Sequence, residues 1–133
     1  MNRIAIAITL CLLSNSAMTE ENWIEHARSE VGSNPTGWSH KWCAKFASDT
    51  LRKSGKRGCP GNTALSCLQA GSRIPGPRPG AIAVMRGHVG FVVSSSGNSV
   101  QVISGNHSGH SGHRAVGIGN YSKARVIAYI WPE

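Results

Sequence analysis

The composition of the chain changes at residues 75–80, where the sequence reads PGPRPG. Before this stretch the apolar residues recur at helical spacing, and after it they form short β-branched runs separated by Gly, Ser and Asn. The Pro-Gly stretch predicts a rigid, turn-prone connection. Helices are therefore expected first and an antiparallel sheet second, which is an α+β domain with N-terminal helices packed on a C-terminal sheet.

Three helices are expected before this connection. The first lies within residues 19–32, with Thr19 as its cap and an apolar stripe along one side. The second runs from about residue 42 to residue 54 and ends before a glycine. A short third helix is expected to follow Asn62 as its cap and to end near Gly71.

Four apolar runs after the connection are expected to be strands. They are residues 81–85, 88–95, 99–104 and 125–131. The stretch SSSGNS, residues 94–99, predicts a hairpin between the second and third of these strands.

Residues 1–17 have the pattern of a secretory signal peptide. Arg3 supplies a positive start, residues 4–13 are apolar, and Ala17 ends a small-residue cleavage pattern. The alternative is an uncleaved membrane anchor, but the apolar run is shorter than the ~20 residues that a membrane span needs. We therefore expect an exported protein, periplasmic or secreted, in which residues 18–133 form a single domain.

Export places the cysteines in an oxidising compartment. Cleavage removes Cys11 and leaves Cys43, Cys59 and Cys67, and an odd number favours one disulfide and one free thiol. Cys59 and Cys67 are close enough in sequence to pair, although two buried thiols are the alternative. Cys43 is then the remaining thiol.

The charge of the chain is strongly basic. It has 14 Lys and Arg against six Asp and Glu, a net charge of +8, and no carboxylate between Asp49 and Glu133. Such a surface favours polyanionic partners, which outside the cytoplasm are anionic wall polymers or lipid head groups rather than nucleic acid. A charge that only keeps a monomer soluble is the alternative.

Cys43 begins the second expected helix, where the helix dipole and unpaired amides stabilise a thiolate. His88 opens an expected strand and is the candidate base. After Asp49 the only acidic residue is Glu133, and a terminal residue is a poor choice for a rigid site. The group that orients His88 is therefore expected to be an amide, another histidine or a backbone carbonyl. Asn106, at the end of the following strand, is the predicted orienting residue, with His107 second. A buried thiol with an unrelated surface histidine is the alternative.

Other features allow two interpretations. His107, His110 and His113 recur every third residue and could bind Zn²⁺ or Ni²⁺. The glycines and serines between them favour a mobile loop beside the active-site cleft instead, and we expect no metal and no other cofactor. Trp38 and Trp42 are predicted to pack in or around the core, with contact to substrate as the alternative.

Three segments of the chain resemble one family. WCAKFASDTLRKSG (42–55), RPGAIAVMRGHVGFVVSSSGNSVQVISGNH (78–107) and RVIAYIWP (125–132) are similar, in this order, to segments of the CHAP (cysteine, histidine-dependent amidohydrolase/peptidase) and NlpC-type cell-wall hydrolases. The resemblance implies a papain-like fold with Cys43 as nucleophile, His88 as base and Asn106 as orienting residue.

The chain departs from the family at Ala81, where an acid is usual, and over residues 56–73, which have no counterpart. The resemblance implies an exported peptidoglycan hydrolase that cleaves an amide bond, as an endopeptidase or an amidase, through a thioester and without a cofactor. The alternatives are a non-catalytic wall-binding or metal-binding module on the same fold, and a cysteine hydrolase that acts on a protein or a small amide.

Overall fold

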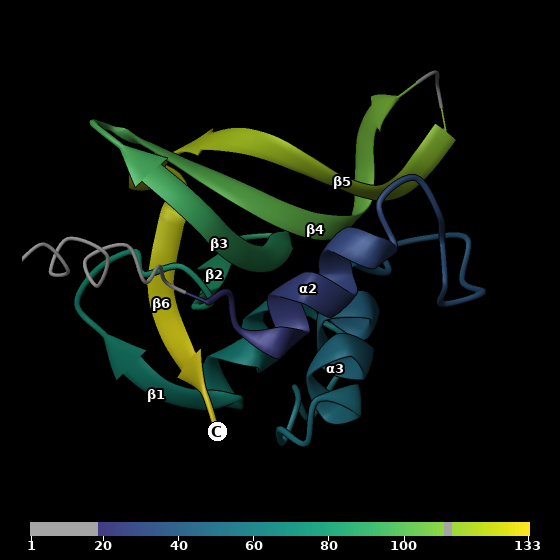
Figure 1. Cartoon of the computed structure of the whole chain (residues 1–133), viewed down its shortest axis with the longest axis horizontal. Coiled ribbons are helices and arrows are strands. Elements are labelled where there is room, and N and C mark those ends of the chain that lie inside the picture. The colour runs from purple at the N-terminus through teal and green to yellow at the C-terminus, as the bar shows by residue number, and fades with distance from the viewer. Residues whose placement is uncertain (1–18, 111–112) are drawn as a thin grey trace, which may run out of the picture.

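The computed structural model describes residues 19–110 and 113–133. Its helices pack on a six-stranded antiparallel sheet with the strand order β1-β6-β2-β3-β4-β5 (Figure 1). The helical elements are α2 (Asn22–Ser29), α3 (Cys43–Lys53), η1 (Ala64–Gln69) and η2 (Lys123–Arg125), and the strands are β1 (Gly71–Ile74), β2 (Ile82–Met85), β3 (His88–Ser96), β4 (Ser99–His110), β5 (His113–Ser122) and β6 (Val126–Pro132). The expected α+β architecture is confirmed.

The helices follow the expected order, with different caps. Glu21 rather than Thr19 occupies the position before α2, and it makes no side-chain capping hydrogen bond. The third helix is a 3-10 helix, and the side chain that caps it belongs to Thr63 rather than Asn62, because the Thr63 hydroxyl accepts a hydrogen bond from the Ser66 amide. Helix α3 begins at Cys43, as the sequence predicts.

The four expected strands are present as β2, β3, β4 and β6, and the hairpin between β3 and β4 is confirmed. Strands β1 and β5 were not predicted. The glycine-rich segment that we expected to be a mobile loop instead extends β4 to His110 and begins β5 at His113. Pairing along the whole of β4 explains the difference, because partner hydrogen bonds can override the low strand propensity of glycine.

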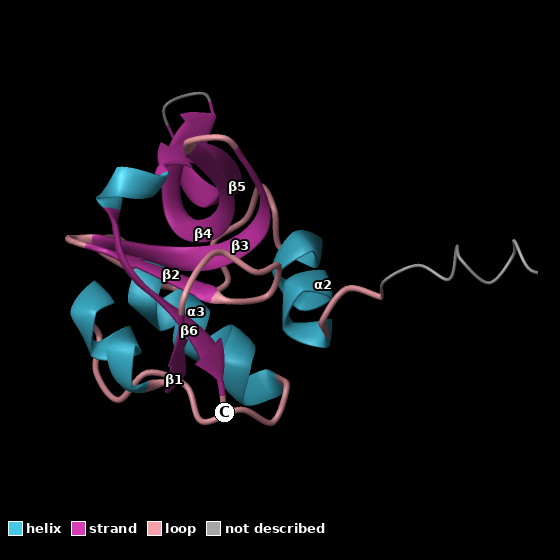
Figure 2. Ribbon diagram, turned by 90° about the vertical axis from the view of Figure 1, so that its left-hand side faces the viewer, coloured by secondary structure: helices cyan, strands magenta, loops and turns pink. Residues whose placement is uncertain are grey.

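The sheet is strongly curved (Figure 2). It carries apolar side chains on both faces. One face packs against α2, α3 and η1 in the main core, and the other covers a smaller cluster that includes Ala83, Val92 and Val102. All four residues of β2 are consequently buried. Burial on both faces explains why this strand is a continuous apolar run in the sequence rather than an alternating one.

The cysteine prediction is confirmed within the described residues: Cys59 and Cys67 form a disulfide, and Cys43 is free. The predicted signal peptide at residues 1–17 lies outside the described residues. Among those that are described, no helix combines the length and apolar character needed to cross a membrane.

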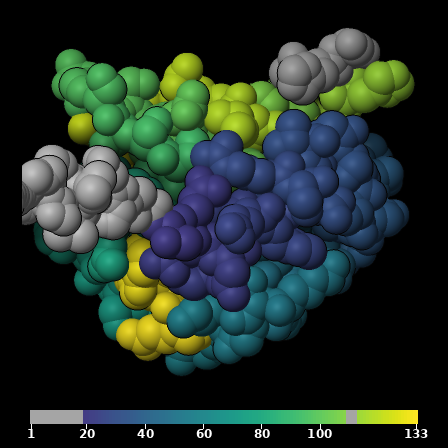
Figure 3. Space-filling view, in the orientation of Figure 1, coloured from purple at the N-terminus to yellow at the C-terminus, as the bar shows by residue number. Residues whose placement is uncertain are grey.

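The loop after α2 is fastened to β5. The Gly32 amide donates to the Val116 carbonyl at 2.9 Å, and the Val116 amide donates to the Ser33 carbonyl at 2.8 Å. In the space-filling view, the purple-to-blue surface of α2 and this loop covers much of one side of the molecule, and the yellow-green surface of β5 lies above it (Figure 3). These two bonds fix the loop that leads to Cys43 against the sheet.

Candidate active site

Cys43 is the first residue of α3 and is 7% exposed. Trp42 precedes it without a side-chain capping bond, so the amides of the first helical turn are not taken up by a cap. Burial raises the pKa of the Cys43 thiol, and hydrogen bonds from the amides of Val89, Ala44 and Cys43 itself oppose that rise. These amides are the groups that would stabilise negative charge on the sulfur.

The hydrogen bond from the Val89 amide places the Cys43 sulfur beside the backbone at the start of β3. His88 is the neighbouring residue in that strand and its first member. The fold therefore brings the two predicted residues to the same place, where the start of α3 meets the start of β3.

Two hydroxyl groups hold the His88 ring. Its Nε2 atom lies 2.9 Å from Ser104 Oγ and 3.3 Å from Tyr121 Oη. The Tyr121 ring also stacks on His88, with ring centroids 5.6 Å apart and an interplanar angle of 30°. These contacts fix the orientation of the imidazole and occupy Nε2, so that Nδ1 is the nitrogen left for another partner.

The electrostatic surroundings of His88 oppose its protonation. Its pKa is lowered to about 4, first by burial and then by the positive charges of His107, Arg125 and Arg114. Because the pKa of Cys43 is raised at the same time, both groups are neutral at pH 7. The pair is a thiol and an imidazole at rest, rather than a thiolate and an imidazolium.

Asn106 lies in a bulge of β4, where the register against β5 shifts between Ser104 and His107. Its φ of 57° is in the left-handed region, which Asn tolerates better than most residues. The preceding Gly105 permits close packing of α3, because a Cβ at this position would lie 2.6 Å from Phe46 Cβ and 2.8 Å from Trp42 Cζ3. The close packing at residue 105 and the left-handed φ at residue 106 are thus enough to explain why Gly and Asn occupy these two positions.

The side chain of Asn106 nevertheless lies in the candidate site. It lines a cavity together with His88, and a second one together with His40 and Lys41. Its Oδ1 atom is buried and has no hydrogen-bond partner among the residues that the structure describes. Asn106 therefore has an acceptor available, while Ser104 and Tyr121 take the contacts to Nε2 of His88.

The sequence analysis did not identify Ser104 and Tyr121. Ser104 is the last residue of an expected strand, and a serine that ends an apolar run was the available sequence signal; its full burial is seen only in the structure. A hydroxyl was not among the orienting groups considered. Tyr121 lies on β5, which was not predicted, so its approach to His88 depends on tertiary structure alone.

The two tryptophans have different environments. Trp42 is 1% exposed and packs edge-to-face on Phe46, which makes it a core residue. Trp38 is 38% exposed, and the Lys45 ammonium lies 5.8 Å from its ring centroid. The loop that carries Trp38 is ordered by the side chain of Asn34, whose Nδ2 donates to the Trp38 carbonyl at 2.7 Å.

No three His, Cys, Asp or Glu side chains within the described part of the chain are grouped to hold a metal ion. The His107 ring lies against β5, because a Cβ at Gly117 would be 2.5 Å from His107 Cδ2 and one at Gly119 would be 2.8 Å from Cε1. The two glycines thus make room for this imidazole.

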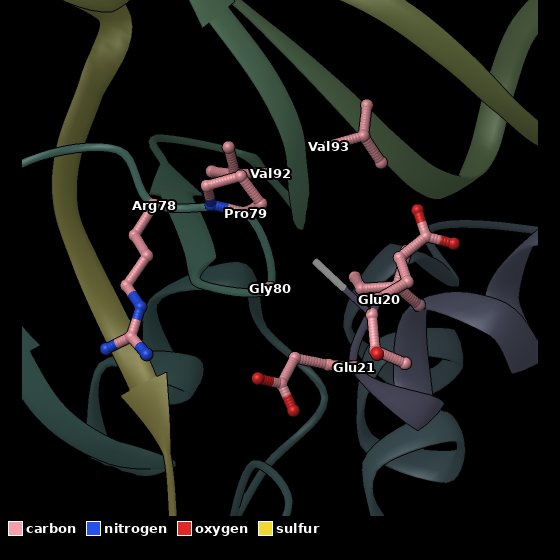
Figure 4. A pocket seen from close by; sticks show the side chains of 9 residues that line it. Glu20, Glu21, Arg78, Pro79, Gly80, Val92 and Val93 are labelled. Carbon is pink, nitrogen blue, oxygen red and sulfur yellow. The ribbon is translucent and has the colours of Figure 1, made fainter. Parts of the chain in front are cut away.

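A separate cavity of about 410 Å³ lies between the start of α2 and the segment before β2 (Figure 4). The side chains of Glu20, Glu21 and Arg78 line it, together with apolar residues that include Ile24 and Val92. None of the predicted catalytic residues lines this cavity.

Comparison with known proteins is consistent with this geometry. A family model described as the CHAP domain matches residues 35–106, a range that includes Cys43, His88 and Asn106. No curated protein matches the chain. Among solved structures, a wild type endolysin, LysIME-EF1, matches with a TM-score of 0.67 and 16% identity, over 86% of this chain and 65% of the endolysin. The chain thus spans just under two thirds of that protein, and the two share a fold.

Proposed function

The chain belongs to the CHAP domain family, and we propose that it is a cysteine hydrolase that cleaves an amide bond of peptidoglycan, as an endopeptidase or an amidase. The observation that carries the proposal is the position of Cys43, a free thiol at the start of α3 that accepts a hydrogen bond from the amide next to His88. An endolysin with the same fold supports peptidoglycan as the substrate.

In the proposed reaction, His88 accepts the Cys43 proton as the sulfur attacks the amide carbonyl. The new C–S bond leaves an oxyanion, and the backbone amide of Cys43 is the proposed donor to it. The C–N bond then breaks, and His88 gives its proton to the leaving amine. Water, deprotonated by His88, attacks the thioester, releasing a carboxylic acid and the Cys43 thiol.

Proton transfer and attack occur together in this scheme, because both groups start neutral. The lowered pKa of His88 makes its imidazolium a strong acid, which favours donation to a poor leaving group such as an amine. Asn106 is retained as the predicted orienting residue. Ser104 and Tyr121 join it as positioning residues, because they contact Nε2 of His88.

We also propose that residues 1–17 are a cleaved signal peptide and that the basic surface holds the exported domain on anionic wall polymers. The mass of the protein recovered from outside the cytoplasm tests the first point. A mature N-terminus at Met18 is expected, and a chain that still begins at Met1 would contradict it.

Digestion of purified peptidoglycan is the decisive test. The mature protein and a Cys43→Ala variant are incubated with it, and the soluble products are identified by mass spectrometry. Fragments that appear only with the unmodified protein establish Cys43 as the nucleophile, and their masses identify the bond.

A negative result is also informative. If both proteins bind peptidoglycan and neither releases fragments, the chain is a binding module on this fold. Hydrolysis that persists in Cys43→Ala would remove Cys43 from the mechanism.

A further inference from the structure

A cavity of about 250 Å³ lies beside His88. Strand β4 supplies Asn106 and His107 to its wall, β5 supplies Arg114 and Tyr121, and η2 supplies Arg125. The cavity therefore lies next to His88, the predicted base, at the end of the sheet where β4 and β5 pair.

This cavity is lined by cations and by no carboxylate. Arg114 and Arg125 bring two guanidinium groups, while the six acidic residues of the chain all lie elsewhere in the described structure. Neither arginine forms an ion pair with a described acidic side chain. Two guanidinium groups without a counter-ion beside a half-buried histidine form a site that an anion would stabilise.

Both guanidinium groups are held in place from the protein side. Arg114 donates from Nη1 to the Asn106 carbonyl at 3.0 Å, which leaves its other N–H groups for a ligand. The Arg125 guanidinium lies 5.4 Å from the centroid of the Tyr121 ring, on the residue that stacks on His88. Tyr121 thus contacts both Arg125 and His88, and all three residues line the cavity.

We propose that Arg114 and Arg125 bind a carboxylate of the substrate, so that the enzyme selects an amide bond next to a free carboxylate in the peptide part of peptidoglycan. This inference rests on the proposed function and names the feature of the substrate that the site selects. Guanidinium groups pair with carboxylates through two parallel hydrogen bonds, and a neutral carboxamide at the same place cannot accept both.

The bound carboxylate also changes the pKa of His88. Besides burial, the charges of His107 from β4, Arg125 from η2 and Arg114 from β5 lower the pKa of His88. The hydroxyls of Ser104 and Tyr121 contact its Nε2 atom, and the Cys43 thiol lies beside the backbone of the next residue, Val89. A carboxylate paired with the two arginines cancels part of their positive charge. The pKa of His88 then rises towards its ordinary value, which favours its protonation during the reaction.

Binding is measured on the Cys43→Ala protein, so that no substrate is consumed. Calorimetry compares stem peptides that carry free carboxylates with the same peptides as carboxamides. Since a hydrogen bond to a charged group contributes about 1.5–3 kcal/mol, the carboxamide is expected to bind about 10- to 100-fold more weakly. Inorganic phosphate and a phosphate-containing wall polymer are titrated alongside.

Variants of the two arginines test whether these residues cause the difference in affinity between the carboxylate and carboxamide peptides. Arg125→Gln, and separately Arg114→Gln, are expected to bind the two peptide forms with nearly equal affinity, through loss of affinity for the carboxylate form. Arg86→Gln is the matched control, because Arg86 is exposed, lies in the turn before His88 and does not line this cavity. It changes the net charge equally and is expected to keep the discrimination. Arg114→Gln also removes the hydrogen bond to the Asn106 carbonyl, whereas Arg125→Gln leaves that bond intact. The test therefore does not depend on a single variant.

The outcomes separate this inference from the proposed function. Equal binding of both peptide forms, or discrimination that survives both arginine variants, overturns the carboxylate site even if peptidoglycan is hydrolysed. Loss of binding to the phosphate polymer in both arginine variants, with unchanged binding of the carboxylate peptide, also overturns it and assigns the arginines to wall attachment. Selective binding of the carboxylate peptide without hydrolysis supports the site and contradicts the proposed reaction.

Discussion

His88 Nε2 and Ser104 Oγ lie 2.9 Å apart, across the pair of strands that forms the centre of the site. A hydroxyl thus lies beside the proposed base, at the position where a carboxylate is usual in a catalytic triad. The relationship has two consequences for His88. Ser104 fixes the direction of the ring without adding negative charge, and the pKa of His88 stays low because the ring is largely buried and nothing nearby offsets the surrounding cations.

Replacing Ser104 with Ala is expected to lower kcat by about 10-fold, because one hydrogen bond that orients the base is lost. KM should change little, since Ser104 is buried and does not line the cavities. Steady-state kinetics on a soluble peptidoglycan fragment measures this effect. Ser95→Ala, on the exposed part of β3, is the control. A Ser104→Ala enzyme with unchanged kcat and pH profile would show that Ser104 does not position His88.

Asn106 is tested with two replacements that differ only in backbone freedom. Gly adopts the left-handed φ of this position freely and Ala does not, so Asn106→Gly removes the side chain with less strain. If Asn106 orients the catalytic groups, both variants lose about 10- to 100-fold in kcat/KM, while only Asn106→Ala also lowers Tm. Full activity in Asn106→Gly would assign the residue to the bulge alone.

The pKa of His88 predicts how stability depends on pH. The unfolded chain binds a proton at His88 near pH 6.5, and the folded protein does so only near pH 4. The contribution of neutral His88 is therefore fully present above pH 6.5 and is lost as the pH falls towards 4, by about 3 kcal/mol at most.

Urea unfolding between pH 4 and pH 8 measures this contribution. A His88→Gln variant should show a flatter dependence over this window, whereas His40→Gln, which changes an exposed histidine, should follow the unmodified protein. Parallel curves for His88→Gln and the unmodified protein would contradict the lowered pKa.

Alkylation of Cys43 is expected to be slow at pH 7 and to accelerate as the pH rises, because burial raises the pKa of the thiol. Iodoacetamide labelling followed by mass spectrometry measures the rate at each pH, and Cys59 and Cys67 should remain unlabelled in their disulfide. Rapid labelling that persists down to pH 5 would indicate a thiolate–imidazolium pair instead.

The disulfide is expected to matter for stability rather than for catalysis. Cys59 and Cys67 are separated by eight positions, and closing a loop of this size stabilises the fold by about 2–3 kcal/mol in the chain-entropy model. Replacing both cysteines with Ala should lower the urea midpoint and leave kcat/KM at 25 °C nearly unchanged. A large loss of activity in a folded double variant would place this segment in the active site.

The sequence by itself predicted three helices followed by four of the six strands, one disulfide with one free cysteine, and the positions of Cys43 and His88 near the starts of α3 and β3. These features depend on local signals: apolar periodicity, turn residues and cysteine number. Cys43 and His88 could be predicted because each begins an element, and the ends of packed elements are where side chains from different layers meet.

Only the tertiary structure decided what surrounds His88. Ser104 approaches across a strand pair, and Tyr121, Arg114 and Arg125 come from β5 and η2, neither of which was predicted. The glycines of β5 suppress its strand signal, yet they are what lets the His107 ring lie against the strand. Pairing between strands that are distant in sequence, rather than local conformational preference, brings these polar and charged groups to His88. No short stretch of sequence therefore predicts which residues contact it.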